Sequence, residues 1–151
     1  MKTFTLAVAL AGLVACGGTE PQPDRPPSTV AFDGTDALLY VDVADEPEER
    51  SRGLMGVESM PTDEGMAFVW DEPVASTFWM KDTLIPLSIA FVDEEERLIG
   101  VRDMQPCEAD PCPTYGVDEP YVLAIEANLG WFDDHGIGAG DRAELRTSAY
   151  V

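Results

Sequence analysis

Two side chains near the middle of the chain have the types and spacing of a small ligand site. Trp79 and Lys81 are two positions apart, so on a β-strand both would leave the same face, while Phe78 and Met80 would enter the core. An aromatic surface beside a cation suits a sugar or a carboxylated ligand. The alternative is structural: Trp79 would fill the core, and Lys81 would pair with Asp82 or a nearby glutamate.

Other polar residues could complete this site. Arg52 would either cap carbonyl groups at the end of a short helix or join Lys81 in binding an anion. Glu126 lies within an apolar strand, so it must either face water or be buried with a partner such as Arg52. Asp141 follows Gly140 and is typical of a turn. The candidate pocket comprises Arg52, Trp79, Lys81, Thr83, Glu126 and Asp141.

No catalytic residue is assigned, because the common enzyme motifs are missing. The sequence contains no Gly-x-Ser-x-Gly, no glycine-rich phosphate loop and no His-Glu-x-x-His. His135 is the only histidine and no calcium-loop spacing occurs, so no metal or cofactor is expected. A carboxylate pair for glycoside hydrolysis stays open, because acidic residues occur along the whole chain.

The charge of the chain restricts its partners. There are 29 acidic and nine basic residues, which give a formal charge of −20 at pH 7. Such a surface repels nucleic acid and anionic lipid headgroups, so we expect no nucleic-acid partner. The acidity fits either a salty habitat, where ions screen self-repulsion, or simple colloidal solubility.

The beginning of the chain predicts its compartment. Lys2 precedes an apolar run over residues 4–14, which has the layout of a secretory signal peptide and is shorter than the about 20 residues that span a bilayer. The run ends in Leu13-Val14-Ala15-Cys16, which resembles the lipobox of bacterial lipoproteins. The resemblance implies cleavage before Cys16 and lipidation of that cysteine. The alternatives are an ordinary secreted protein with a cysteine near the cut, or an uncleaved anchor.

These features divide the chain into three parts. We expect a lipoprotein signal peptide at residues 1–15, a lipidated and disordered tether at 16–29, and a single β-rich domain at 30–151. The protein would then be lipid-anchored in the cell envelope, outside the cytoplasm, either in the periplasm or on the outer surface. In that oxidising compartment Cys107 and Cys112 favour a structural disulfide over a zinc site or a redox pair.

Short apolar segments separated by turn residues predict a mainly β fold. We expect strands at residues 37–43, 65–70, 74–80, 87–92, 98–104, 121–127 and 141–146, and short helices at 45–53 and 130–135. Residues 65–70 should form a hairpin with 74–80, and 87–92 with 98–104. The spacing favours a β-rich α+β domain, built as a compact antiparallel barrel or sandwich of about seven short strands with two short helices.

Several segments carry a resemblance to a known family. They are Arg52-Gly53-Leu54-Met55, Asp63-Glu64-Gly65-Met66-Ala67-Phe68-Val69-Trp70, the long block from Phe78-Trp79-Met80-Lys81-Asp82-Thr83 to Val92, Tyr121-Val122-Leu123-Ala124-Ile125-Glu126-Ala127, and Gly136-Ile137-Gly138-Ala139-Gly140-Asp141. Over most of residues 50–146 the chain resembles the prokaryotic family known as domain of unknown function 192. The resemblance implies a compact β-rich fold and no assigned reaction. Gly56-Val57 stands where the family pattern has an arginine, and Ser88 where it has an aspartate.

Three functions are compatible with these features. The preferred one is a non-catalytic envelope module that binds a small ligand, a cell-wall component or a protein partner. The second is an enzyme acting on envelope carbohydrate, with Glu126 or Asp141 as acid or base, and the third is a passive acidic surface protein. Convergence of Arg52, Lys81 and Glu126 in an open pocket would favour a site, whereas their mutual pairing would favour a structural role.

Overall fold

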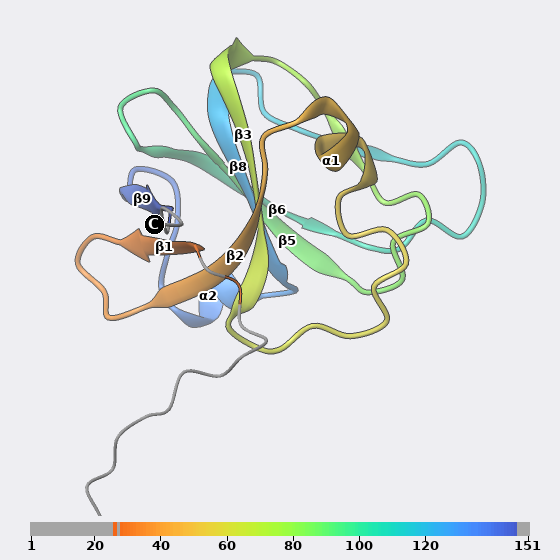
Figure 1. Cartoon of the computed structure of the whole chain (residues 1–151), viewed down its shortest axis with the longest axis horizontal. Coiled ribbons are helices and arrows are strands. Elements are labelled where there is room, and N and C mark those ends of the chain that lie inside the picture. Colours follow the sequence, from red (N-terminus) through yellow and green to blue (C-terminus); the bar gives the residue numbers. More distant parts are fainter. Residues whose placement is uncertain (1–25, 27, 148–151) are drawn as a thin grey trace, which may run out of the picture.

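The fold is described by a computed structural model of the chain, which covers residue 26 and residues 28–147 (Figure 1). The predicted signal peptide, Cys16 and most of the predicted tether lie outside these residues. Within the described part, no helix combines the length and the apolar composition needed to cross a lipid bilayer.

Nine strands and two short helices make up the described part of the chain. In chain order they are β1 (Ser28–Phe32), β2 (Leu38–Ala44), α1 (Pro47–Arg52), β3 (Glu64–Val74), β4 (Phe78–Trp79), β5 (Leu87–Val92), β6 (Leu98–Met104), β7 (Thr114–Tyr115), β8 (Tyr121–Asn128), α2 (Trp131–Asp134) and β9 (Ala143–Arg146). The predicted mainly β fold with two short helices is confirmed. β1 begins inside the segment that was expected to be the end of the tether.

Seven of the strands form one sheet in the order β6-β5-β8-β3-β2-β1-β9, which curls into a half-barrel (Figure 1). β4 pairs with β7 as a separate two-stranded sheet. All neighbours in the large sheet are antiparallel except β2 and β3, which run parallel, because α1 and the loop after it form the crossover that a parallel pair requires. The ends of the curl meet through three backbone hydrogen bonds of 2.8–2.9 Å between residues 96–98 and 140–143.

One predicted hairpin is confirmed and the other is wrong. β5 and β6 pair as expected. β3, however, continues to Val74 without a turn and pairs with β8. The Asp71-Glu72-Pro73 segment lies where the register between β3 and β8 shifts. Phe78–Trp79 pairs instead with Thr114–Tyr115. The three residues of the expected turn are exposed at the end of β3, where polar side chains and a proline are tolerated in a strand.

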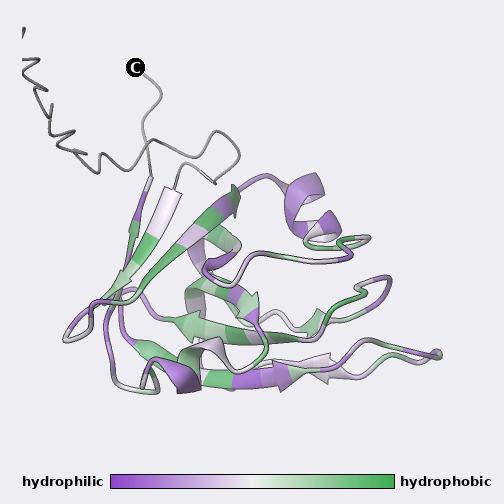
Figure 2. Cartoon of the chain, turned by 90° about the horizontal axis from the view of Figure 1, so that it is seen from below, coloured by the Kyte–Doolittle hydropathy of each residue, from purple (hydrophilic) through white to green (hydrophobic). Residues whose placement is uncertain are grey.

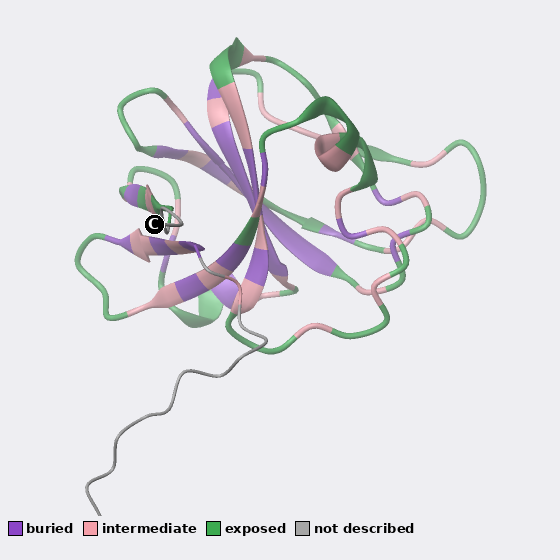
Figure 3. Ribbon diagram, in the orientation of Figure 1, coloured by how far each residue is buried: buried purple, intermediate pink, exposed green. Residues whose placement is uncertain are grey.

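The central strands β5 and β8 are largely buried on both faces, as Figure 3 shows, and each face of the large sheet has its own core. The first core fills the inside of the curl and includes Phe32, Ile125 and the Trp131 ring of α2. The second core lies on the opposite face, includes Phe68, and is covered by α1, β4, β7 and their loops. Because side chains alternate along β8, Glu126 faces the second core. α1 contributes no buried residue and is largely hydrophilic in Figure 2.

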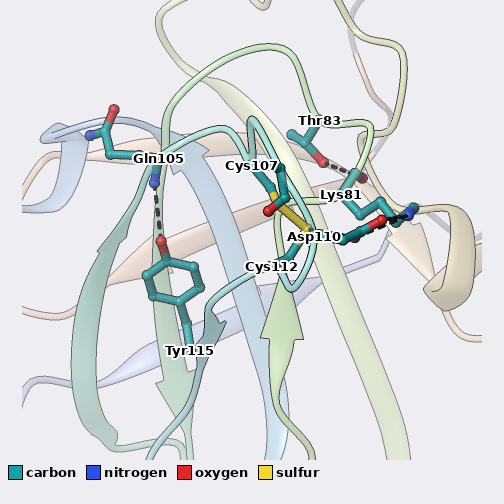
Figure 4. Close-up of a disulfide and its surroundings, with 8 residues drawn as sticks. Lys81, Thr83, Gln105, Cys107, Asp110, Cys112 and Tyr115 are labelled. Carbon is teal, nitrogen blue, oxygen red and sulfur yellow. Dashed lines mark hydrogen bonds and ion pairs between the residues drawn. A yellow bond between two sulfur atoms is a disulfide. The ribbon is translucent and has the colours of Figure 1, made fainter.

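The predicted disulfide is confirmed. Cys107 and Cys112 are bonded, with Cα atoms 5.5 Å apart, in the loop between β6 and β7 (Figure 4). Asp110, inside the closed ring, accepts a contact of 3.2 Å from the Lys81 ammonium group. The ring therefore joins the β6–β7 loop to the segment that follows β4.

Replacing both Cys107 and Cys112 by serine should lower the free energy of unfolding by about 2 kcal/mol, because the closed ring restricts the unfolded chain. The half-barrel should still form, since the bond joins two residues of one loop. Urea unfolding of both proteins measures the difference, and reduced wild-type protein is the matched control. Free thiols in wild-type protein made under oxidising conditions, or equal midpoints, would contradict this account.

Candidate ligand-binding groove

A groove opens over the second core, between α1 and β4. Its outer part has a volume of about 380 Å³ and its inner part about 40 Å³. The two parts are adjacent, since they share Arg50, Ser51, Phe68, Phe78 and Trp79 as bordering residues. We call the two parts together the groove, and the small inner part alone the inner pocket. The inner pocket reaches Glu126 of β8.

Glu126 lies in the middle of β8 and is only 5% exposed. Its neighbours across the sheet are the apolar residues Met66 of β3 and Ile89 of β5. Gly65 lets β3 approach this closely, because a Cβ atom there would collide with the carbonyl oxygen of Glu126. No described residue forms an ion pair or a hydrogen bond with the Glu126 side chain. The structural partner expected for it, Arg52, does not pair with it.

The Glu126 carboxyl is directed into the inner pocket. Every fully buried side-chain oxygen or nitrogen in the described part has a hydrogen-bond partner, so the unpaired oxygens of Glu126 must reach the pocket. Burial raises the pKa of this carboxyl to about 8, from an ordinary value of 4.5. At neutral pH the group is therefore mainly a protonated acid, which can both donate and accept a hydrogen bond.

The walls of the inner pocket are two loops that contact each other. The chain leaves α1 through Gly53, whose φ of 48° favours glycine and whose missing side chain leaves room for the Phe68 ring. The opposite wall is the turn after β4, in which Thr83 is buried. The backbone N–H of Gly56 donates to the carbonyl of Asp82 at 2.9 Å and joins the two walls.

Aromatic rings line the groove. Phe78 makes edge-to-face contacts with Phe68 and Trp70, with ring centres 5.1 and 6.3 Å apart. Trp79 is 51% exposed, so it lies at the rim, and its interpretation as core filler is wrong. A ring face at the rim can stack against the apolar face of a sugar or an aliphatic chain.

Two arginines of α1 border the groove, and they differ in whether the guanidinium group is bound by other residues of the protein. Arg50 is held in place: it donates to the carbonyl of Val69 at 2.9 Å and lies 5.4 Å from the centre of the Trp70 ring. Arg52 is exposed and has no hydrogen bond or ion pair with any described residue. The carbonyl cap expected of Arg52 is made by the backbone N–H of Gly53 instead. Arg52 is thus a cation that a ligand can reach.

Lys81 and Asp141 do not line the groove, although Lys81 Nζ lies 5.9 Å from the centre of the Trp79 ring at the rim. Lys81 pairs with Asp110, so neither the expected contact with Asp82 nor one with Glu126 forms (Figure 4). The Asp141 carboxylate accepts a hydrogen bond of 2.8 Å from the backbone N–H of Gly138, as a turn residue does. The structure brings together four residues of the candidate pocket, Arg52, Trp79, Thr83 and Glu126. Among the described residues, no cluster of three metal-ligating side chains occurs.

Several bordering residues were not predicted for the site. Phe78 was expected only in the core, and Phe68 and Arg50 were not singled out as ligand contacts. The family resemblance is the sequence signal that could have identified them. Nearly all residues of the inner pocket belong to the segments that resemble the family: Arg52–Met55, Phe68, Phe78, Trp79, Thr83 and Glu126.

The two departures from the family pattern lie outside the inner pocket. Ser88 of β5 donates to Asp103 at 2.6 Å and accepts from the backbone N–H of Gly130 at 2.9 Å, so it positions the start of α2. It faces away from Glu126, because its neighbour Ile89 faces the second core. Gly56, at the other departure, connects the groove walls through its backbone.

Glu126→Gln should change how stability depends on pH. The folded carboxyl has a pKa near 8 and keeps a proton that the unfolded chain releases above about 4.5, so this group lowers wild-type stability as pH rises between those values. Glutamine removes the effect. Relative to wild type, the variant should gain about 4 kcal/mol of stability between pH 5 and pH 8, and little more above pH 8.

Urea unfolding of both proteins from pH 5 to pH 9 measures this difference. Asp110→Asn is the matched control, because that carboxylate is exposed and its loss should leave the difference nearly constant. Parallel stability curves for wild type and Glu126→Gln would show that the buried carboxyl does not titrate as described.

Two solved structures share this fold and are related in sequence. One, from Sinorhizobium meliloti 1021 and described as a candidate transcription regulator, is 26% identical with a TM-score of 0.70, and the match covers 80% of this chain and 95% of that chain. The other, a protein of unknown function from Novosphingobium aromaticivorans DSM 12444, is 29% identical with a TM-score of 0.70, covering 78% of this chain and 83% of that chain. No curated protein matches the chain.

The sequence also matches a family model over residues 29–145, which span nearly the whole described domain and all of the inner pocket. The model is that of DUF192, described as "Uncharacterized ACR". The chain therefore belongs to the family known as domain of unknown function 192.

Proposed function

We propose that this protein is a lipid-anchored module of the cell envelope that binds a small ligand in the groove and catalyses no reaction. The lipobox-like segment that ends in Cys16 supports the anchor. The disulfide between Cys107 and Cys112 fits an oxidising compartment outside the cytoplasm. The ligand would be a free small molecule or the exposed end of a cell-wall component, since a protein partner would have to insert a side chain into so narrow an inner pocket.

The observation that carries the binding proposal is the unpaired carboxyl of Glu126 at the end of the inner pocket. Burial disfavours the charged form of this carboxyl, so stability alone would favour an apolar residue at this position. Arg52 and Trp79 add a free cation and an aromatic face at the rim. A few polar groups converging in a mainly apolar pocket are typical of small-molecule sites.

An enzyme that acts on envelope carbohydrate is the second candidate. The raised pKa of Glu126 suits a general acid, which must be protonated at working pH. Glycoside hydrolysis ordinarily requires a second carboxylate about 5–10 Å from the first. Glu126 is the only acidic side chain among the described residues that line the groove, so the lining supports binding better than hydrolysis.

The remaining alternatives have less support. The relative from Sinorhizobium meliloti is described as a candidate transcription regulator, but a formal charge of −20 opposes nucleic-acid binding by this chain. A passive acidic surface protein would not require a groove that ends at a buried, unpaired acid.

Cys16→Ser should move the protein from the membrane fraction to the soluble fraction, or leave the precursor uncleaved. Each buried CH₂ of an acyl chain contributes about 0.8 kcal/mol to membrane binding, so several chains anchor firmly and their loss releases the protein. Fractionation and intact-mass measurement check this, with Gly18→Ser as the neighbouring control. A wild-type amino terminus elsewhere, without lipid, would contradict the anchor.

Peptidoglycan fragments released by a muramidase are the first probe of the groove. On binding, the indole N–H resonances of Trp70 and Trp79 should shift. The resonance of Trp131 should not, because its indole is buried in the first core and donates to Asp63 at 3.1 Å. Arg52→Ala should weaken binding at least about tenfold through loss of a charge-assisted hydrogen bond.

Arg97→Ala is the control for this experiment, because it removes the same charge from the β5–β6 turn. It should leave the affinity unchanged. Fragments that shift none of the groove resonances at saturating concentration would count against the proposed ligand class, and equal effects of both arginine variants would place binding outside the groove.

A further inference from the structure

We infer that the ligand of the groove carries a primary ammonium group that pairs with Glu126 and a carboxylate that pairs with Arg52. This inference rests on the proposed function and narrows it from a small ligand to a zwitterion of the amino-acid type. The two contacts come from groups that no other described residue uses.

The inner pocket has the size and lining of an ammonium site. Its volume of about 40 Å³ admits a group of a few atoms and excludes a sugar ring. The rings of Phe68, Phe78 and Trp79 border it, and aromatic faces attract cations. Thr83 donates its hydroxyl proton to the carbonyl of Lys81 at 3.4 Å, which leaves the lone pairs of the hydroxyl oxygen as a second acceptor.

The rim has the features of a carboxylate site. Among the described arginines, Arg97, Arg142 and Arg146 form ion pairs, whereas Arg50 and Arg102 donate to backbone carbonyls. Arg52 alone among them has neither kind of contact. In a chain with 29 acidic residues, an unpaired arginine beside a pocket is conspicuous, and a guanidinium group matches a carboxylate in shape and charge.

The charged surroundings of Glu126 allow an ammonium group to enter. α1 presents Arg50 and Arg52 to the groove, and the flanking strands present Met66 and Ile89. β4 presents aromatic rings, and the Lys81 ammonium group beside the Trp79 ring is paired with Asp110. No described acid in the lining competes with Glu126 for the cation. The ligand's own carboxylate offsets repulsion between its ammonium group and the two arginines.

Binding of this kind is coupled to loss of a proton. The free carboxyl, with a pKa of about 8, is roughly nine-tenths protonated at pH 7. When the ammonium group enters, the acid transfers its proton to the buffer and becomes the carboxylate partner of the cation. The affinity should therefore rise about tenfold from pH 6 to pH 7 and level off above about pH 8. A neutral hydroxyl ligand would behave oppositely: its affinity would be constant at low pH and fall above pH 8.

The test uses linear ω-amino acids from glycine to 6-aminohexanoate, because the series varies the distance between ammonium and carboxylate. Hexanoate and hexylamine are the matched ligands with one charge each. The protein carries ¹³C-labelled glutamate carboxyls, so NMR reports both the affinity and the charge of Glu126. At least one amino acid should bind more than about tenfold tighter than either control and should ionise Glu126 at pH 7.

Variants assign the two contacts. Glu126→Gln should abolish the pH dependence and weaken amino-acid binding at least about tenfold. Arg52→Ala should weaken amino-acid binding similarly but should not weaken the binding of hexylamine, which has no carboxylate, and Arg97→Ala should change neither.

Two results would overturn the inference: amino acids that bind with Glu126 still protonated, or amino acids that bind no better than the single-charge controls. If peptidoglycan fragments still shift the Trp70 and Trp79 resonances in that case, the proposed function stands and only the zwitterion is wrong. If neither probe reaches the groove, both proposals fail.

Discussion

The burial of one carboxyl in the middle of the sheet constrains the rest of this domain. Glu126 lies on β8 between β3 and β5, where the curl of the sheet requires cover on both faces. Removing an acid from water disfavours its charged form, so the group stays protonated at neutral pH and its oxygens still need contact with water or a ligand. The groove and the buried acid therefore depend on each other. A cover packed without a gap would leave the Glu126 carboxyl without contact with either water or a ligand.

Within the cover over Glu126, the helix α1 is held by a few local contacts rather than by a large apolar interface. α1 buries no side chain, and it is attached through Arg50, which contacts the carbonyl of Val69 and the ring of Trp70. The hydrogen bond from Gly56 to Asp82 joins the two loops, and the ring closed by the disulfide reaches the same turn. The first core, which packs around α2 on the other face, does not depend on these contacts. Substitutions at the groove can therefore alter binding while the half-barrel persists.

The sequence predicted where strands lie better than how they pair. Alternating apolar residues locate a strand from local information, and most strands appear where that pattern occurs. Pairing depends on distant segments: β3 lies between β2 and β8 because α1 forms a crossover, which no local turn signal reveals. Glu126 could be singled out because an acid within an apolar strand is unusual. The partner of Lys81 could not be predicted from the sequence, because it is the folded disulfide loop that brings Asp110 close to Lys81.

The acidity of the chain and the charge of the groove are separate properties. The described ion pairs are formed mostly by exposed side chains, and such pairs contribute only about 0–1 kcal/mol each, so the excess of acids does little for stability. Inside the groove the balance is reversed, because two arginines border it and its single acid is mainly neutral at pH 7. A simple anion is attracted by the arginines at the rim but repelled by the surrounding acidic surface. A simple cation is attracted by that surface but repelled by the arginines at the rim. A zwitterion avoids net repulsion from the surface and can satisfy both the rim and the inner pocket, so the overall charge and the local charges favour the same class of ligand.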